Sequence, residues 1–151
     1  MKTTVKLSGF KEMDAELARL KPATGKAAMR RALKTAAQPM ADLAQSMAPV
    51  GDTHTLAPSI SVSTKLSKRQ AKLHRKTVKN DKASVEMFVG AGPLSSAHTQ
   101  EFGTVNHPPQ PFMRPAWDQD HMALLDRLKD ALWAEITKAM KRAAKRGQLR
   151  G

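Results

Sequence analysis

Histidine and carboxylate side chains are the groups in this chain that could carry acid–base or metal chemistry. His98 and Glu101 lie three residues apart, a spacing that lets two side chains meet on one face of a helical turn. Such a pair suits a polar contact, because a catalytic dyad needs a third group to orient it. The five His residues form neither H-x-x-x-H nor H-E-x-x-H, and the chain has no Cys, so we expect no metal site.

Motifs for nucleophilic or nucleotide chemistry are missing from the sequence. Ser95 and Ser96 do not lie in a G-x-S-x-G context, and neither a Walker sequence nor G-x-G-x-x-G occurs. The glycines of G-A-G-P at 90–93 predict a turn, because Pro93 lacks the amide hydrogen that a phosphate loop uses. We therefore expect neither an enzyme nor a cofactor.

The segment 100–117, QEFGTVNHPPQPFMRPAW, is the most distinctive part of the sequence. It holds two of the four Phe, one of the two Trp and four of the nine Pro. Proline fixes φ and lacks an amide hydrogen, so the segment stays extended and presents rings that lose little entropy on docking. We predict that it contacts its own core, another copy or a partner through Glu101, Phe102, Gly103, Val105, Pro108, Pro109, Pro111, Phe112, Met113, Arg114 and Trp117.

Within this segment, we predict which side chains point into the core and which point outward. The rings of Phe112 and Trp117 are expected to point into the core, and residues 105–109 are expected to point outward. Glu101 and Arg114 are expected to form an ion pair, either within one chain or between two subunits.

Positive charge dominates the chain, which has a net charge of +13 and a pI near 10.4. Basic clusters attract polyanions or acidic protein faces, although a solvated loop and a basic helix end would give the same pattern. No Phe, Tyr or Trp interrupts the run 68–82, so any nucleic-acid binding would address phosphates without reading sequence. The candidate contacts with DNA or a partner are Lys68, Arg69, Lys72, Arg75, Lys76, Lys79 and Lys82.

Hydrophobic periodicity predicts the elements that position these groups. Apolar residues at helical spacing predict helices over 8–20, 24–47 and 117–145, and a shorter one over 95–102 that ends at Gly103. Pro39 is expected to kink or interrupt the second of them. Alternating residues predict two antiparallel strands, one over 60–66 and one over 85–89. The basic run between them is either a projecting β-arm or a loop with a short helix over 69–74.

These elements predict an α+β fold, in which a small antiparallel sheet packs against a kinked N-terminal helix and a long C-terminal helix. We expect one domain over 1–151, with a basic arm at 67–83 and a basic tail at 146–151. Aromatic residues are scarce, so the core should rely on aliphatic residues, Ala and Met. No apolar run reaches the length of a membrane span, and we expect a soluble protein made in the cytoplasm.

Several fragments, taken in order, resemble one known family. The chain is similar to the small neck and tail-completion proteins of long-tailed lambdoid siphophages. This tail-component family is typified by the tenth gene product of one such phage. The resemblance covers about 10–145 and depends most on E-F-G-T followed by P-F-M-R-P-A. The fragments are A-P-V at 48–50, L-x-x-S-I at 56–60, V-G and G-P within 89–93, E-F-G-T at 101–104 and P-F-M-R-P-A at 111–116.

The resemblance implies a structural virion protein without enzymatic activity, which forms a ring at the head-to-tail interface. Its implied partners are further copies of itself, the head connector or stopper, the tail terminator or tail tube, and phage DNA in the channel; no membrane is implied. It would lie in the virion neck, and in the host cytoplasm during assembly. The charge leaves open an alternative, a sequence-independent nucleic-acid-binding or packaging protein.

Overall fold

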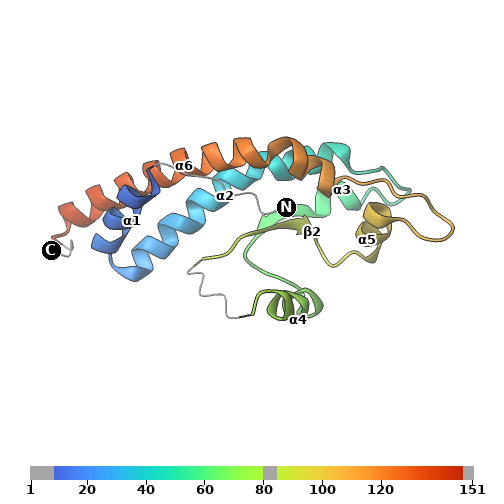
Figure 1. Ribbon diagram of the computed structural model, residues 1–151, viewed down its shortest axis with the longest axis horizontal. Helices are drawn as coiled ribbons and strands as arrows, with labels where there is room; N and C mark the ends of the chain where they lie inside the picture. The colour runs from blue at the N-terminus through green and yellow to red at the C-terminus, as the bar shows by residue number, and fades with distance from the viewer. Residues whose placement is uncertain (1–8, 80–84, 148–151) are drawn as a thin grey trace.

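The computed structural model describes residues 9–79 and 85–147, which form helices and one small sheet (Figure 1). The α+β class predicted from the sequence is confirmed. Among the described helices, none is both long and apolar enough to cross a membrane. The elements, in chain order, are α1 (Phe10–Arg19), α2 (Pro22–Met47), α3 (Leu56–Ser59), β1 (Ile60–Ser63), α4 (Lys68–Thr77), β2 (Phe88–Ala91), α5 (Ser95–Phe102) and α6 (Met113–Lys145).

The long helices α2 and α6 form the body of the molecule and run in opposite directions (Figure 1). Alanines on α2 are fully buried where it meets α6, because a residue without a long side chain lets two helices approach closely. Of the larger apolar residues whose helical spacing predicts this helix, Met40 is buried, whereas Met29, Leu33, Leu43 and Met47 are only half-buried. The helix also continues through Pro39 without interruption. The buried alanines of α2 are Ala28, Ala32, Ala36, Ala37, Ala41 and Ala44.

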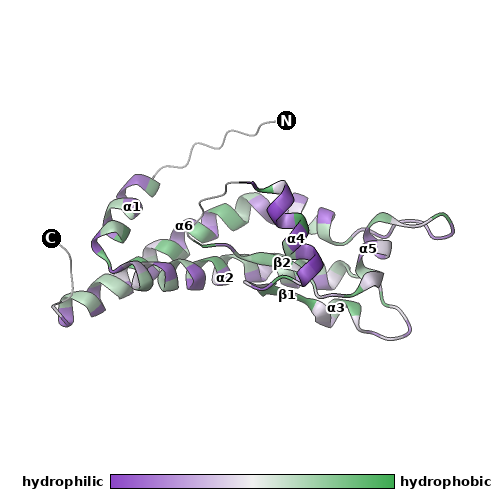
Figure 2. Ribbon diagram, turned by 90° about the horizontal axis from the view of Figure 1, so that it is seen from below, coloured by the Kyte–Doolittle hydropathy of each residue, from purple (hydrophilic) through white to green (hydrophobic). Residues whose placement is uncertain are grey.

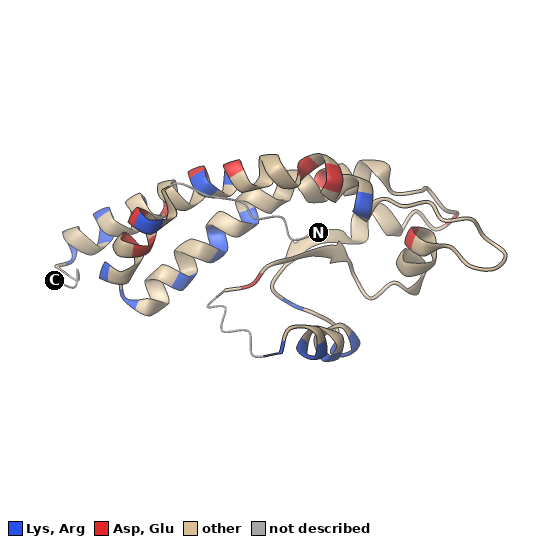
Figure 3. Ribbon diagram, viewed as in Figure 1, with Lys and Arg blue, Asp and Glu red and all other residues tan. Residues whose placement is uncertain are grey.

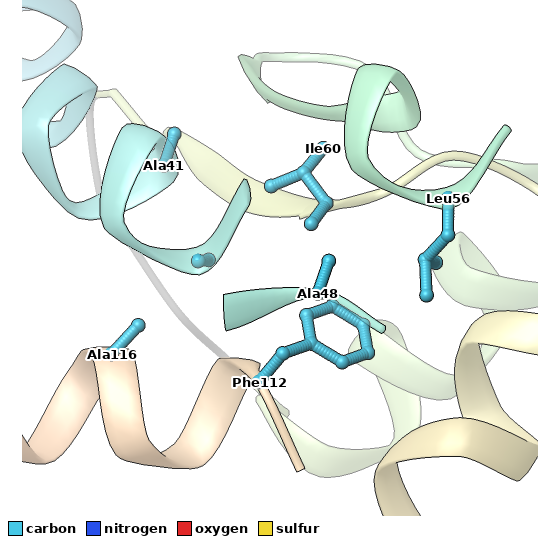
Figure 4. Packing of buried hydrophobic residues seen from close by; sticks show 7 residues of the cluster. Ala41, Ala48, Leu56, Ile60, Phe112 and Ala116 are labelled. Carbon is cyan, nitrogen blue, oxygen red and sulfur yellow. The ribbon is translucent and has the colours of Figure 1, made fainter. Parts of the chain in front are cut away.

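The hydrophobic core gathers at the end of this helix pair that lies next to the sheet. The ring of Phe112 is 1% exposed and packs against Leu56, Ile60 and Ala48 (Figure 4). A second, smaller cluster joins Leu20 to the far ends of α2 and α6. The core therefore ties residues just before α6 to the sheet and to α2.

The sheet has two antiparallel strands, β1 and β2, in the register Ile60↔Ala91 to Ser63↔Phe88. Both strands are shorter than predicted, and β2 begins three residues after Val85. The ladder ends at Ser63 because the chain turns there, with the Ser63 hydroxyl accepting a hydrogen bond from the amide of Lys65 at 3.0 Å. Without a partner strand, residues 85–87 stay outside the sheet.

The basic run forms a helix, α4, which supports the second of the two alternatives drawn from the sequence. Ser67 and Gln70 make a capping box: the Ser67 hydroxyl accepts from the Gln70 amide at 3.3 Å, and the Gln70 side chain accepts from the Ser67 amide at 3.0 Å. The helix is longer than the expected 69–74. Figure 2 shows it as largely hydrophilic.

Candidate interaction site

Glu101, at the end of α5, caps the N-terminus of α6. One carboxylate oxygen accepts hydrogen bonds from the amides of Phe112 at 2.8 Å and Met113 at 2.9 Å. The other oxygen accepts from the amide of Arg114 at 3.0 Å. The first amides of a helix have no partner within the helix, and their dipoles favour a negative charge. The Glu101 side chain of α5 therefore supplies the N-terminal cap of α6, because the side chain of Phe112 makes no capping hydrogen bond.

Arg114 holds the same carboxylate from the solvent side. Its Nε lies 2.9 Å from Glu101 Oε1, and its Nη2 donates to the backbone carbonyl of Glu101 at 2.7 Å. The guanidinium also lies 4.8 Å from the centre of the Phe102 ring. The ion pair predicted between Glu101 and Arg114 therefore forms within one chain, and it fastens α5 to α6.

Opposing effects act on the pKa of Glu101. Burial raises the pKa, but the hydrogen bonds from the amides of Phe112 and Met113 and from Arg114 together bring it below its usual value of 4.5. The carboxylate is 5% exposed and stays ionised because donors surround it. On α6, the side-chain hydrogen bond from Arg31 lowers the pKa of Glu135, against a smaller upward effect of burial.

These lowered pKa values predict an acid-sensitive fold. A carboxyl whose pKa is lower in the folded than in the unfolded chain contributes stability that is present above the unfolded pKa and is lost as the pH falls through the folded pKa. We expect the free energy of unfolding, measured by urea titration, to fall as the pH drops below about 4.5, the usual value for Glu101. Glu101→Gln and Glu135→Gln should each reduce this dependence. An unchanged dependence in Glu101→Gln would contradict the cap.

Residues 103–111, which we call the proline loop, leave this anchor as a projecting turn. The amides of Thr104 and His107 donate to each other's carbonyls at 2.8 and 3.3 Å, and the amide of Gln110 donates to the carbonyl of Gln100 at 2.7 Å. Figure 1 shows the loop at the end of the molecule, beyond α5. Backbone hydrogen bonds at the base and near the tip of the loop thus hold it in one conformation.

Gly103 makes the sharp exit from α5 possible. Its φ is +75°, and its amide donates to the carbonyl of Thr99 at 2.8 Å, so it ends the helix as predicted. A Cβ at this position would lie 2.8 Å from the nitrogen of Pro109 and 2.9 Å from the carbonyl oxygen of His107. Only glycine fits between the two sides of the loop.

The other predicted residues of the segment separate into buried and exposed groups. Phe112 points into the core as expected, and Met113 is half-buried beside it. Trp117 was expected to point inward and is instead 55% exposed, stacked on His121 with ring centroids 5.5 Å apart. Val105 at the tip is fully exposed, and the Phe102 ring is 56% exposed. The prolines of the loop, Pro108, Pro109 and Pro111, are exposed as well.

The described basic candidates form a separate surface on α4 and just after it. Their side chains are all exposed, and the opposite side of the helix rests on the sheet through His74, which lies 3.4 Å from Glu86 and edge-on to the ring of Phe88. Lys82 lies outside the described residues, as do 80–83 of the arm and 148–151 of the tail. The described members are Lys68, Arg69, Lys72, Arg75, Lys76 and Lys79.

One set of exposed residues was missed in the sequence, an acidic line along α6. Asp118, Asp126 and Asp130 repeat with Met122 at intervals of four residues, so each lies one turn above the last and about 40° further round the helix. The four-residue spacing of these residues is visible in the sequence, although basic residues dominate the chain as a whole. Within 9–79 and 85–147, no group of three His, Asp or Glu side chains is placed to hold a metal ion.

The described surface thus offers an anchored loop, a basic helix and an acidic line, which are features of a protein that contacts other macromolecules. Comparison with protein families gives a match over residues 11–103 to the family described as "Bacteriophage HK97-gp10, putative tail-component". The match covers more than half of the chain, and the protein belongs to this family of phage tail components. No curated protein and no solved structure matches the chain.

Family membership makes the protein a structural component of a phage tail, and therefore of the virion. The matched region ends at Gly103, so it includes Glu101 and α4 but leaves out most of the proline loop and all of α6. The cap geometry links the two parts, because the carboxylate inside the matched region holds the amides that begin α6.

Proposed function

We propose that this protein, as a single domain, forms a ring at the head-to-tail interface of a tailed phage and joins the head connector to the tail tube around the DNA channel. The observation that carries the proposal is the proline loop, which is fixed at its base by the Glu101 cap and ends in a fully exposed Val105. A preordered apolar tip loses little conformational entropy when a partner covers it. Membership of the tail-component family supports the same role.

In this proposal the loop docks on a neighbouring protein while the core residues hold it in place. Val105, Pro108, Pro109 and Pro111 make the contact, with Phe102 and Trp117 beside it. Gly103 and the pair Glu101–Arg114 set the direction in which the loop leaves the body. Phe112 and Met113 act from inside, by fastening the start of α6 to the sheet.

Deletion of the gene for this protein from the phage genome tests whether the protein joins heads to tails. Electron microscopy of lysates should show filled heads and separate tails, and supplying the full chain from a plasmid should restore joined particles. Intact, correctly joined particles in the absence of the protein would overturn the proposal.

Val105→Asp is expected to reduce joined particles by more than tenfold without unfolding the chain. The substitution places a charge at the tip of the loop, where an apolar contact would have to desolvate it at a cost of about 2 kcal/mol or more. Since the Val105 side chain is fully exposed, the free energy of unfolding should change by less than about 0.5 kcal/mol. Complementation of the deleted phage measures the effect.

Ala134→Asp is the matched control, because it adds the same charge to an exposed position of α6, away from the loop. It should support joining at the wild-type level. Equal joining by the two variants would remove the proline loop from the interface.

The exposed basic face of α4 favours a second candidate, sequence-independent binding of nucleic acid. Binding through phosphates predicts that log K falls steeply as log salt rises, and that removal of the lysines flattens the slope. A filter-binding salt titration of the purified chain distinguishes nucleic-acid binding from the neck role. The comparison is a variant in which Lys68, Lys72 and Lys76 are replaced by Gln. Weak binding with intact joining supports the neck role.

A further inference from the structure

We propose that α4 of one copy packs against the acidic line on α6 of the next copy, so that this pair of surfaces makes the contact around the ring. The inference rests on the proposed ring and adds which surfaces meet in it. The acidic line consists of Asp118, Met122, Asp126 and Asp130.

The basic surface has a regular spacing. Lys68, Lys72 and Lys76 repeat at intervals of four residues, so they lie one above another on the same side of α4. All three side chains are exposed, and among the described residues none of them takes part in an ion pair. Leu73 lies beside this line and is 55% exposed, so an apolar side chain is available for contact next to the lysines.

The acidic surface has the same spacing. Successive residues of a helix are separated by about 100°, so Asp118, two positions after the buried Ala116, lies on the side of α6 opposite the contact with α2. Each further step of four residues turns by about 40°, so the line winds gradually round α6 through the exposed Asp126 to the exposed Asp130, which borders α1 beside Met13. In the described part of the chain, the three aspartates have no ion-pair partner. Met122, between them, is 54% exposed.

The two lines share a four-residue spacing and a similar composition, and the shorter basic line fits within the length of the acidic one. At 1.5 Å per residue the lysines extend over about 12 Å of α4, and the acidic line extends over about 18 Å of α6. Each line also has one exposed apolar residue, Leu73 or Met122, that would be removed from water in the contact. Opposite charges at matching intervals fix both the choice of partner and its register.

Their placement on the molecule requires two copies. Figure 3 shows the basic α4 below the body of the molecule and acidic segments of α6 along its upper side. Two complementary surfaces on different sides of one subunit cannot meet within that subunit. They join copies head to tail, which gives a ring when the rotation between copies closes.

Cysteine cross-linking tests the contact directly, because the natural chain has no Cys. Leu73→Cys and Met122→Cys are introduced separately and together, and particles assembled with these full-length chains are treated with a short bismaleimide. The double variant should give a ladder of covalent oligomers. Mixed single variants should give dimers that contain one chain of each kind. Absence of cross-links between copies, in particles that contain the protein, would overturn the inference.

Charge reversal provides a second test that does not depend on the cross-linker. K68E/K72E/K76E should reduce the ladder by at least about tenfold, because like charges then face each other. D118K/D126K/D130K should do the same, and the combination should restore the ladder by exchanging the two charges. Circular dichroism checks that each variant is folded. Failure of the combination to rescue would count against the pairing.

Reversal of lysines at the other end of α6, K138E/K141E/K145E, is the control for net charge. It makes the same change in charge as the α4 variant and should leave the ladder unchanged. The two proposals fail in different ways: absence of the protein from the neck removes the proposed function, whereas a neck that contains it without Leu73–Met122 links removes only this contact.

Discussion

Glu101→Ala should lower the free energy of unfolding by about 3 kcal/mol, because it leaves three amides at the start of α6 and the Arg114 guanidinium without their acceptor. Hydrogen bonds to a charged group are worth more than neutral ones, and this carboxylate is 5% exposed. Urea unfolding at neutral pH, followed by circular dichroism, measures the loss. Glu101→Gln should lose less, since one oxygen can still accept.

Glu16→Gln is the matched control for the removal of a carboxylate. Glu16 forms an exposed ion pair with Arg19 at 3.2 Å, one turn away on α1, and such pairs contribute about 0.5 kcal/mol or less. Equal losses in Glu16→Gln and Glu101→Ala would mean that the cap contributes no more than an ordinary surface contact. The proline loop would then lack the fixed base that the proposed function requires.

Phe112→Ala should be at least as damaging, with an expected loss of about 3 to 5 kcal/mol. The ring is 1% exposed, and its removal leaves a cavity between the start of α6, the sheet and α2 (Figure 4). A loss of this size is a large part of the stability of an ordinary domain. Thermal and urea unfolding of the variant measure it.

Trp117→Ala is the comparison, because it removes an even larger ring from the same segment. That ring is 55% exposed and stacks on His121, so its loss should cost no more than about 1 kcal/mol. Joining of heads to tails should suffer more than stability does. Equal destabilisation by the two substitutions would contradict the difference in burial on which the site depends.

The contrast between these two rings shows where sequence patterns stop being informative. Phe112 and Trp117 are both aromatic residues in one motif, and the sequence offers no reason to separate them. Because α6 begins at Met113, Ala116 takes the inward position one turn after Phe112, and Trp117 lies about 100° further round the helix. The early start of α6 depends on the Glu101 cap, a contact between elements that helix periodicity does not reveal.

The core shows a similar limit. Periodicity correctly predicts α2 and α6 as long helices, but it favours the larger side chains as core residues. Close approach of the two helices instead buries alanines such as Ala32 and Ala41, and leaves Leu33 half-exposed at the edge. For α4 the deciding signal was local: Ser67 followed by Gln70 three residues later is a capping box, and it favours the helix over a β-arm.

The arrangement of the neck tests the central claim most directly. A reconstruction of the neck by electron cryomicroscopy, from particles of the phage that encodes this chain, should contain a ring of copies between the head connector and the tail tube. Each copy should show the α2–α6 pair as two long adjacent helices, with the proline loop against another protein. A neck whose density is fully accounted for by other proteins would contradict the account.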